Sequence, residues 1–489
     1  MSLLLTVDRH GTLPLWKQIV TRVTQLVDDG TLPPGSRLPP TRSLALTLEV
    51  NRSTVCRAYE ELWALGYLVS RPGSYSTVRG RARPLMAGDR SPSLVDWSGV
   101  ATAGARRAYD HVASLASLPS PKRGWVDFAS LSADASLCPA DELRRAARHV
   151  LLEHGSALLD YGDPSGYRPL RDTLARRLRT HGVAVLPDDI LVTHGAQQAL
   201  ELVLKTFVRP GGSVLVEAPT YGLMIPLLQL FDTRPIQVPM GPDGMDLDQV
   251  EGILGKERPD LVYTMPTFQN PTGITTSQAH RERLLSLCET HRVPILEDGF
   301  EEEMKYFGKA VLPIKSMDAH GIVIYVGTFS KVIFPGLRIG WIAADRECSR
   351  RLTMVSRFCA LSGSTLDQAA MHRFCEAGHY ERYLRRLHTT YRRRMQALVR
   401  GLKRHMPAGC ATWTEPLGGC TLWLRAVSAR PVTEAAILER AHAERVLVTP
   451  GSYFVPDTPT TACFRLSIAR AKVHEIDEGC RRLARAVKP

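Results

Sequence analysis

The stretch GTFSKVIFPGLRIGW, residues 327–341, follows an apolar run that is typical of a buried strand. Two hydroxyl side chains, Thr328 and Ser330, come directly after this strand, followed by Lys331 and, seven positions further on, Arg338. A lysine at the end of a buried strand can form a Schiff base with an aldehyde. A Ser-Lys pair is weak evidence alone, because most lysines in turns lie at the surface, so the neighbouring segments decide its interpretation.

Three segments upstream favour a cofactor site. MPTFQNPTG occupies residues 265–273, and in ILEDGFEEEMKYFG (295–308) Asp298 ends an apolar strand, where open α/β sheets bind their ligands. A carboxylate beside a pyridine nitrogen favours the pyridinium, the electron-withdrawing form that pyridoxal phosphate (PLP) needs. In THGAQQALELV (193–203) a strand, a glycine turn and a helix start follow one another, and such a helix N-terminus suits a phosphate.

Helical and strand patterns alternate beyond residue 125. Helical periodicity covers 141–154, 167–181 and 197–206, and short apolar runs lie between and after these helices, at 191–192, 214–216, 261–263, 295–296 and 322–326. This alternation predicts an α/β domain with a mostly parallel sheet covered by helices.

The first 80 residues follow another pattern. A helix is predicted over 14–27, a second is predicted to be capped by Thr41, a third by Ser53, and two short strands are predicted at 67–70 and 75–78. Three helices and a hairpin make a winged helix-turn-helix, and the alternative is a small helical bundle with a solvated basic face.

The totals narrow the function further. A length of 489 residues exceeds one ordinary core, and a net charge of +13 fits a polyanionic partner. No apolar stretch approaches the ~20 residues of a membrane span and no signal-peptide pattern opens the chain, so we expect a cytoplasmic, nucleoid-associated protein without membrane contact. The ten cysteines are scattered without a Cys-x-x-Cys pair, which favours reduced thiols over a metal site.

Residues 38–74, LPPTRSLALTLEVNRSTVCRAYEELWALGYLVSRPGS, resemble the GntR-type DNA-binding domain over almost their whole length. They depart from its pattern at Pro40, where a serine is usual, and at Tyr75, where a glycine is common. The resemblance implies double-stranded operator DNA as the partner. It also implies that the DNA-facing residues are Arg42, Arg52, Ser53, Thr54 and Arg57, with Arg71 and Gly73 in the wing.

The segments beyond residue 125 resemble fold-type I PLP-dependent aminotransferases, and the whole chain resembles the MocR subfamily of GntR regulators. This resemblance implies that Lys331 carries PLP as a Schiff base, that Asp298 pairs with the pyridine nitrogen, that Asn270 bonds the ring oxygen and that Tyr221 stacks on the ring. It implies that Arg465 holds a ligand carboxylate. The phosphate would be held by Ala196, Gln197, Thr328, Ser330 and Arg338, with Tyr161 reaching in from a second subunit.

One position departs from the family's pattern. Phe300 stands where these regulators usually have a tyrosine whose hydroxyl bonds the ring oxygen of PLP. We therefore expect the Schiff base on Lys331 to have a higher pKa than in relatives with the tyrosine, because a hydrogen bond that stabilises the deprotonated imine is missing. A spectroscopic titration of Phe300→Tyr should then show a lower pKa than the natural chain.

The predicted organisation has a winged helix-turn-helix at 1–80, a basic flexible linker at 81–124 and an aminotransferase-like domain at 125–489, which ends in a smaller α+β subdomain. The first function hypothesis is a regulator, a head-to-tail homodimer, that senses an amino acid or amine through aldimine formation at Lys331. The second is an active aminotransferase with an accessory DNA-binding domain. The third is a regulator that senses PLP itself and needs no amino-acid ligand.

Overall fold

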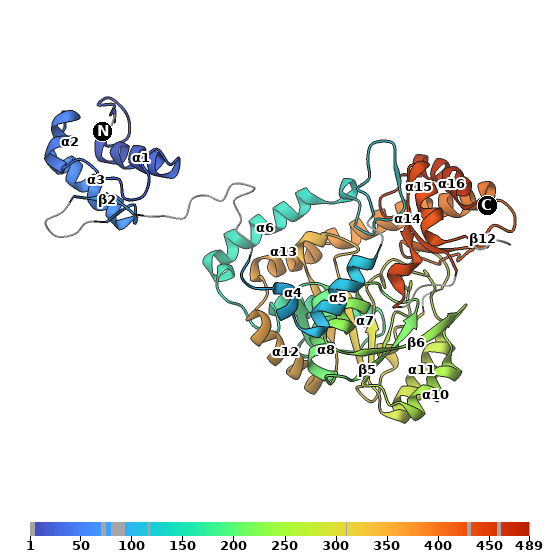
Figure 1. The fold of residues 1–489 in the computed structure, drawn as a ribbon. Helices are drawn as coiled ribbons and strands as arrows, with labels where there is room; N and C mark the ends of the chain where they lie inside the picture. Colours follow the sequence, from blue (N-terminus) through green and yellow to red (C-terminus); the bar gives the residue numbers. More distant parts are fainter. Residues whose placement is uncertain are drawn as a thin grey trace. The chain divides into compact units, whose positions relative to one another are not determined.

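The computed structural model describes residues 5–69, 75–79, 93–115, 118–309, 311–427, 432–456 and 461–488. The chain divides into two compact units, Met1–Gly99 and Val100–Pro489 (Figure 1). Among the residues described, no helix is both long and apolar enough to cross a membrane.

The N-terminal unit contains three helices and a two-stranded antiparallel hairpin, in the order α1 (Leu15–Asp28), α2 (Thr41–Thr47), α3 (Arg52–Ala64), β1 (Leu68–Val69) and β2 (Thr77–Val78). Its own small core joins one face of each helix, and Ile19, Leu44 and Val55 are almost completely buried there. This confirms the predicted order of elements and excludes a purely helical bundle.

Two predicted helix caps are wrong. Thr41 is the first residue of α2, because the carbonyl of Pro40 already accepts the first helical hydrogen bond, from the backbone N–H of Leu44 at 3.0 Å. In α3 the N-cap is Asn51, whose side chain accepts from the N–H of Ser53 at 3.0 Å and from its hydroxyl at 2.8 Å. Ser53 therefore lies inside the helix, because the asparagine side chain satisfies its N–H first.

The larger unit is built on an eight-stranded sheet in the order β4-β11-β10-β9-β8-β5-β6-β7. The pairs from β10 to β6 are parallel, whereas β11 runs antiparallel to both of its neighbours and β7 runs antiparallel to β6. The sheet is thus mixed, with a parallel centre. The strands are β4 (Ile190–Thr193), β5 (Ser213–Ala218), β6 (Arg234–Gly241), β7 (Gly244–Met245), β8 (Leu261–Thr264), β9 (Ile295–Asp298), β10 (Val323–Thr328) and β11 (Gly340–Ala343).

Helices cover this sheet, which explains why every residue of β8, β9 and β10 is buried. The three helices predicted from periodicity are present as α6, α7 and α8. The helices up to the C-terminal part are α6 (Ala140–His154), α7 (Arg168–Thr180), α8 (Ala196–Phe207), α9 (Met224–Leu230), α10 (Leu247–Lys256), α11 (Gln278–His291), α12 (Arg346–Ala360) and α13 (Thr365–Glu376).

The C-terminal part forms a second, smaller layer with an antiparallel sheet in the order β12-β13-β16-β15. The long helix α14 packs against α16, and β14 pairs in parallel with β3 (Val126–Asp127). The elements are α14 (His379–His405), β12 (Ala411–Trp413), β13 (Thr421–Ala426), α15 (Glu434–Ala443), β14 (Val446–Leu447), β15 (Thr449–Pro450), β16 (Cys463–Ser467) and α16 (Val473–Val487).

Part of the segment predicted as linker is folded. It contains α4 (Trp97–Val100) and α5 (Ala103–Ser114), and α5 packs against α9. The fit is close, because a Cβ added at Gly104 would lie 2.5 Å from the carbonyl oxygen of Leu230, and Arg107 forms an ion pair with Asp232. Residues 103–114 therefore belong to the larger unit.

Candidate cofactor pocket and DNA-facing helix

A pocket of about 690 Å³ opens at the carboxyl ends of the parallel strands, within the usual size range of small-molecule sites. Nine of the predicted cofactor residues line it: Ala196, Gln197, Tyr221, Asn270, Asp298, Thr328, Ser330, Lys331 and Arg338. Five further lining residues were not predicted as cofactor ligands: Ser132, Leu200, Met265, Phe300 and Pro335. Segments separated by more than 130 residues thus meet at one edge of the sheet.

Lys331 lies in the turn that follows β10. Burial lowers the pKa of its ammonium group, opposed by the nearby Glu301 carboxyl and reinforced by the charges of Arg465 and Arg338. A lower pKa increases the fraction of neutral amine, the form that attacks a carbonyl carbon.

Asp298 ends β9, and its carboxyl is buried in the wall of the same pocket. Burial raises its pKa to about 6, while a hydrogen bond from the hydroxyl of Tyr263 to Oδ2, at 2.9 Å, opposes that rise. Oδ1 has no hydrogen-bond partner among the residues that the structure describes. A buried carboxylate oxygen without a partner fits a pyridinium N–H, which would satisfy it.

The phosphate-binding features lie at the start of α8 and after β10. Gly195 precedes α8 with φ 82°, and a Cβ there would lie 2.7 Å from the guanidinium of Arg338, which donates to the carbonyl of His194 at 2.8 Å. The buried hydroxyl oxygen of Ser330 has no partner among the described residues. A helix N-terminus, a free hydroxyl and an arginine together suit a phosphate.

Arg465, on β16, reaches the same pocket through Asn270. Its Nη1 donates to Oδ1 of Asn270 at 3.2 Å, and its Nη2 donates to the carbonyl of Ala129 at 2.8 Å and to Oγ1 of Thr449 at 3.1 Å. Burial lowers the pKa of Arg465 to about 10, and its Nε has no partner among the described residues. The guanidinium is therefore fixed in place and keeps one donor for an anion.

Tyr221 and Phe300 also occupy pocket positions. The hydroxyl of Tyr221 donates to Oε1 of Gln197 at 3.1 Å, and burial raises the pKa of Tyr221 to about 12, so the phenol stays protonated. Phe300 is 6% exposed and presents an apolar ring to the pocket.

Two supporting residues were missed by the sequence analysis, Tyr263 and Glu217. The carboxylate of Glu217 accepts from the hydroxyl of Thr264 at 2.6 Å, from the N–H of Met265 at 2.9 Å and from Nε2 of Gln269 at 2.9 Å. It holds the segment that leads to Asn270, and burial raises its pKa to about 7. A charged residue inside the apolar run of β5 was a signal that could have found it.

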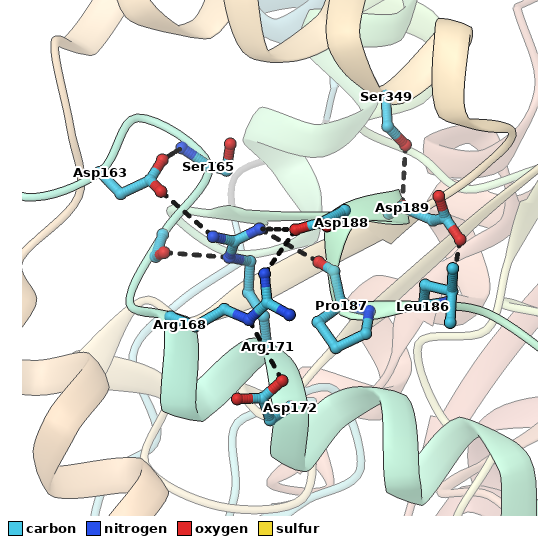
Figure 2. Close-up of polar contacts among 11 residues, drawn as sticks. Asp163, Ser165, Arg168, Arg171, Asp172, Leu186, Pro187, Asp188, Asp189 and Ser349 are labelled. Atoms are coloured by element: carbon cyan, nitrogen blue, oxygen red, sulfur yellow. Dashed lines mark hydrogen bonds and ion pairs between the residues drawn. The ribbon is translucent and has the colours of Figure 1, made fainter.

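Tyr161 does not line the pocket of its own chain, since it is 81% exposed. Its loop is nevertheless held firmly by the buried Arg171, which donates to the carbonyls of Gly166 and Pro187, both at 3.1 Å, and pairs with Asp163 at 3.1 Å. Figure 2 shows the Arg171 guanidinium between Asp163 on one side and Pro187 and Asp188 on the other.

The predicted DNA-facing residues lie on the exposed side of the N-terminal unit. Arg42 on α2 and Arg52, Ser53 and Arg57 on α3 are exposed, and Thr54 is half-buried. The guanidinium of Arg57 lies 4.4 Å from the ring centre of Trp16 on α1. Arg71 and Gly73 of the predicted wing fall outside the described residues.

Comparison with known proteins agrees with both units. Residues 15–78 match the model of the bacterial regulatory proteins of the gntR family, and residues 129–483 match that of aminotransferase class I and II. The HTH-type transcriptional regulator YisV of Bacillus subtilis (strain 168) is 30% identical over 98% of this chain and 97% of its own. The probable rhizopine catabolism regulatory protein MocR of Rhizobium meliloti is 30% identical over 82% of this chain and 80% of its own.

The chain belongs to the MocR-type regulators of the GntR family. Its effector domain is similar in fold to the α-aminoadipate aminotransferase LysN of Thermus thermophilus, solved in complex with N-(5'-phosphopyridoxyl)-L-leucine, with a TM-score of 0.73, 32% identity, and coverage of 80% of this chain and 98% of the other. The cofactor of this MocR-type regulator is PLP, and its winged helix-turn-helix binds DNA.

Proposed function

We propose that this MocR-type regulator binds an amino acid or amine at PLP on Lys331, and that this binding changes the affinity of its homodimer for operator DNA. The observation that carries the proposal is the contact between Arg465 and Asn270, because it places a fixed guanidinium beside the cofactor residues. A guanidinium in that position can hold a planar carboxylate by two parallel hydrogen bonds.

Each pocket residue has a role that follows from its environment. PLP, when bound, supplies an aldehyde carbon that condenses with primary amines. The lowered pKa of Lys331 favours the neutral amine that this condensation needs, and the unpartnered Oδ1 of Asp298 accepts a hydrogen bond from the pyridine nitrogen. The hydroxyl of Ser330, the guanidinium of Arg338 and the N-terminus of α8 hold the phosphate.

Regulation requires that the effector binds two conformations of the chain with different affinities, because equal affinity shifts nothing. An effector amine that displaces Lys331 frees this side chain from the cofactor, and an effector carboxylate adds a ligand to Arg465. Both changes act on the segments 327–341 and 463–467, which belong to the large and small layers of the effector unit.

A homodimer is part of this proposal, with Tyr161 completing the partner subunit's pocket. The rigid, exposed placement of Tyr161 supports it, as does a set of exposed apolar side chains around the hydrogen bond from the N–H of Gly162 to Oγ of Ser362 at 3.2 Å. These side chains are Leu152, Leu159, Met354, Phe358 and Leu361. A sedimentation velocity run at micromolar concentration should give the mass of a dimer, and a monomer would contradict it.

We also propose the predicted division into 1–80, 81–124 and 125–489 as the functional one, with α5 as a docked element of the middle segment, and a cytoplasmic, nucleoid-associated location. A head-to-tail arrangement would let the middle segment of one chain carry its DNA-binding domain to the partner.

The first test is the absorption spectrum of the purified protein, with Lys331→Ala in parallel, before and after borohydride and during titration with amino acids and amines. The proposal expects a yellow chromophore that borohydride reduces, that Lys331→Ala lacks, and that at least one compound shifts. A protein that stays colourless after incubation with PLP would contradict cofactor binding.

Aminotransferase activity is a second candidate, because Lys331, Asp298 and Arg465 are all in place. Turnover of an amino acid with an oxoacid acceptor would favour it, whereas a spectral shift without turnover favours the regulator. A response of DNA binding to PLP alone, with no effect of any amine, would indicate a sensor of the cofactor.

A further inference from the structure

The longest helix of the effector unit, α14 (His379–His405), carries an excess of positive charge that the cofactor pocket does not use. It contains eight arginines and one lysine against a single acidic residue, Glu381, and Glu381 pairs with Arg177. The net charge of this one helix is a large part of the +13 of the whole chain.

The basic residues lie on one side of α14. Its opposite face is buried, with an aromatic and aliphatic stripe that includes Tyr383, Tyr391 and Leu398. The exposed basic side chains recur at helical spacing: Arg382, Arg385, Arg386, Arg392, Arg393, Arg400, Lys403 and Arg404. They therefore form one stripe, which we call the α14 basic stripe.

Few internal partners neutralise this stripe. Lys403 pairs with Glu415, Arg392 lies over the ring of Phe307, and Arg382 contacts the ring of His379. The guanidinium groups of five arginines have no hydrogen bond or ion pair to any described residue: Arg385, Arg386, Arg393, Arg400 and Arg404. Other helices differ, since arginines on α12 and α16 pair with Glu347 and Glu478 on the same helix.

Helix stability does not explain the charges. Cations near a helix C-terminus interact favourably with its dipole, which accounts for Lys403 and Arg404 but not for Arg385 and Arg386 near the N-terminus. Like charges three or four residues apart, such as Arg382 and Arg386, destabilise a helix by a few tenths of a kcal/mol per pair. A polyanion bound along the stripe would turn this repulsion into attraction.

The geometry of the stripe fits duplex DNA. From Arg385 to Arg404 the helix rises about 30 Å at 1.5 Å per residue, which is close to one turn of B-DNA. Arginine binds phosphate oxygens through two parallel hydrogen bonds, and such contacts need no particular base sequence.

We propose that the α14 basic stripe is a second DNA-binding surface, on the effector unit, that contacts backbone phosphates in addition to those held by the winged helix-turn-helix. The inference rests on DNA being the partner of the N-terminal unit. Its contribution is independent of base sequence, so it adds affinity and salt dependence but no selectivity among sites.

The test is fluorescence anisotropy of the full-length protein with a labelled 40-bp duplex of mixed sequence, over a salt series. The stripe variant is Arg385→Gln, Arg386→Gln, Arg393→Gln and Arg400→Gln combined. The matched control removes the same charge around α10 and α11: Arg234→Gln, Lys256→Gln, Arg258→Gln and Arg283→Gln. Glutamine is a good helix former, and circular dichroism and PLP absorbance of both variants check folding.

The slope of log K against log salt changes by about 0.9 for each phosphate that the protein no longer neutralises. The stripe variant should therefore have a slope smaller in magnitude by about 3 to 4 and bind at least about tenfold more weakly at moderate salt, and the pair Arg393→Gln and Arg400→Gln should show about half of that change in slope. The control should change the slope by less than about 1.

An unchanged slope in the stripe variant, or an equal loss in the control, would overturn the inference. If Arg52→Ala still abolished binding in the first case, the N-terminal unit would remain the sole DNA-binding surface and the proposed function would stand. If neither Arg52→Ala nor the stripe variant affected binding, the proposed function itself would fail.

Discussion

The hydroxyl of Tyr263 donates a 2.9 Å hydrogen bond to Oδ2 of Asp298, and this leaves Oδ1 of the same carboxylate as the oxygen without a partner among the described residues. Tyr263 comes from β8 and Asp298 from the neighbouring strand β9, and both side chains are buried. The tyrosine thus orients the carboxylate and counteracts the effect of burial on its pKa.

Replacing Tyr263 by phenylalanine should weaken PLP binding by about five- to tenfold, because the Asp298 carboxylate loses a hydrogen bond worth about 1 kcal/mol and its pKa rises further. The dissociation constant of PLP, measured by absorbance titration, checks this. Tyr391→Phe is the matched control, since Tyr391 is equally buried and its hydroxyl contacts only the carbonyl of Ala469, at 3.4 Å, among the residues described. Equal PLP affinities in the two variants would contradict the role of Tyr263.

Replacing Asp298 by asparagine should stabilise the PLP-free protein near pH 7 while it weakens PLP binding. Burial raises the pKa of Asp298 to about 6 from an ordinary value of 3.8. A carboxyl with a raised pKa binds more protons in the folded state, so unfolding free energy falls as pH rises through about 6.

The natural PLP-free protein should therefore lose up to about 3 kcal/mol from this group between pH 4 and 7, a loss that Asp298→Asn removes. Thermal unfolding of both proteins over that pH range measures it. Parallel stability curves would show that Asp298 does not titrate in this window.

Arg465→Gln should discriminate between effector classes. The affinity for amino acids should fall about 10- to 100-fold, because a charged hydrogen bond contributes about 1.5–3 kcal/mol, while the affinity for amines without a carboxylate should stay nearly unchanged. The shift of the PLP spectrum during titration reports both. Arg425→Gln, at an exposed position on β13, is the control. A similar loss for amines and amino acids would argue against a carboxylate contact.

Two substitutions on α3 should separate DNA contact from domain stability. Arg52→Ala should weaken DNA binding with little change in melting temperature, because Arg52 is exposed. Arg57→Ala should also destabilise the N-terminal unit by about 0.5–1 kcal/mol, since its guanidinium lies over Trp16. Anisotropy with DNA and thermal melts measure the two effects, and an unaltered affinity in Arg52→Ala would remove this residue from the interface.

Local sequence signals predicted most of the pocket. The glycine before α8, the carboxylate at the end of β9 and the lysine after β10 follow their strands directly, and parallel strands bring such ends together. Arg465 was found only through family resemblance, because its contact with Asn270 joins residues 195 positions apart. No period or spacing encodes that meeting.

The features that the sequence did not reveal depend on tertiary packing or on competition between neighbours. Tyr263 read as one more apolar strand residue, and its partner Asp298 comes from the adjacent strand. Docking of α5 depends on the missing side chain of Gly104, which lets the helix approach α9. The cap of α3 was misassigned because Asn51 and Ser53 are both good caps, and only the local geometry chooses between them.

The central claim is that an effector bound at Lys331 changes DNA binding. The most direct measurement is the affinity of the full-length protein for a duplex covering its operator, with and without the compound that shifts its absorption spectrum, in the natural chain and in Lys331→Ala. The account predicts at least about a fivefold change in the natural chain, the size of a typical coupling, and none in Lys331→Ala. Equal affinities with and without the compound in the natural chain would contradict it.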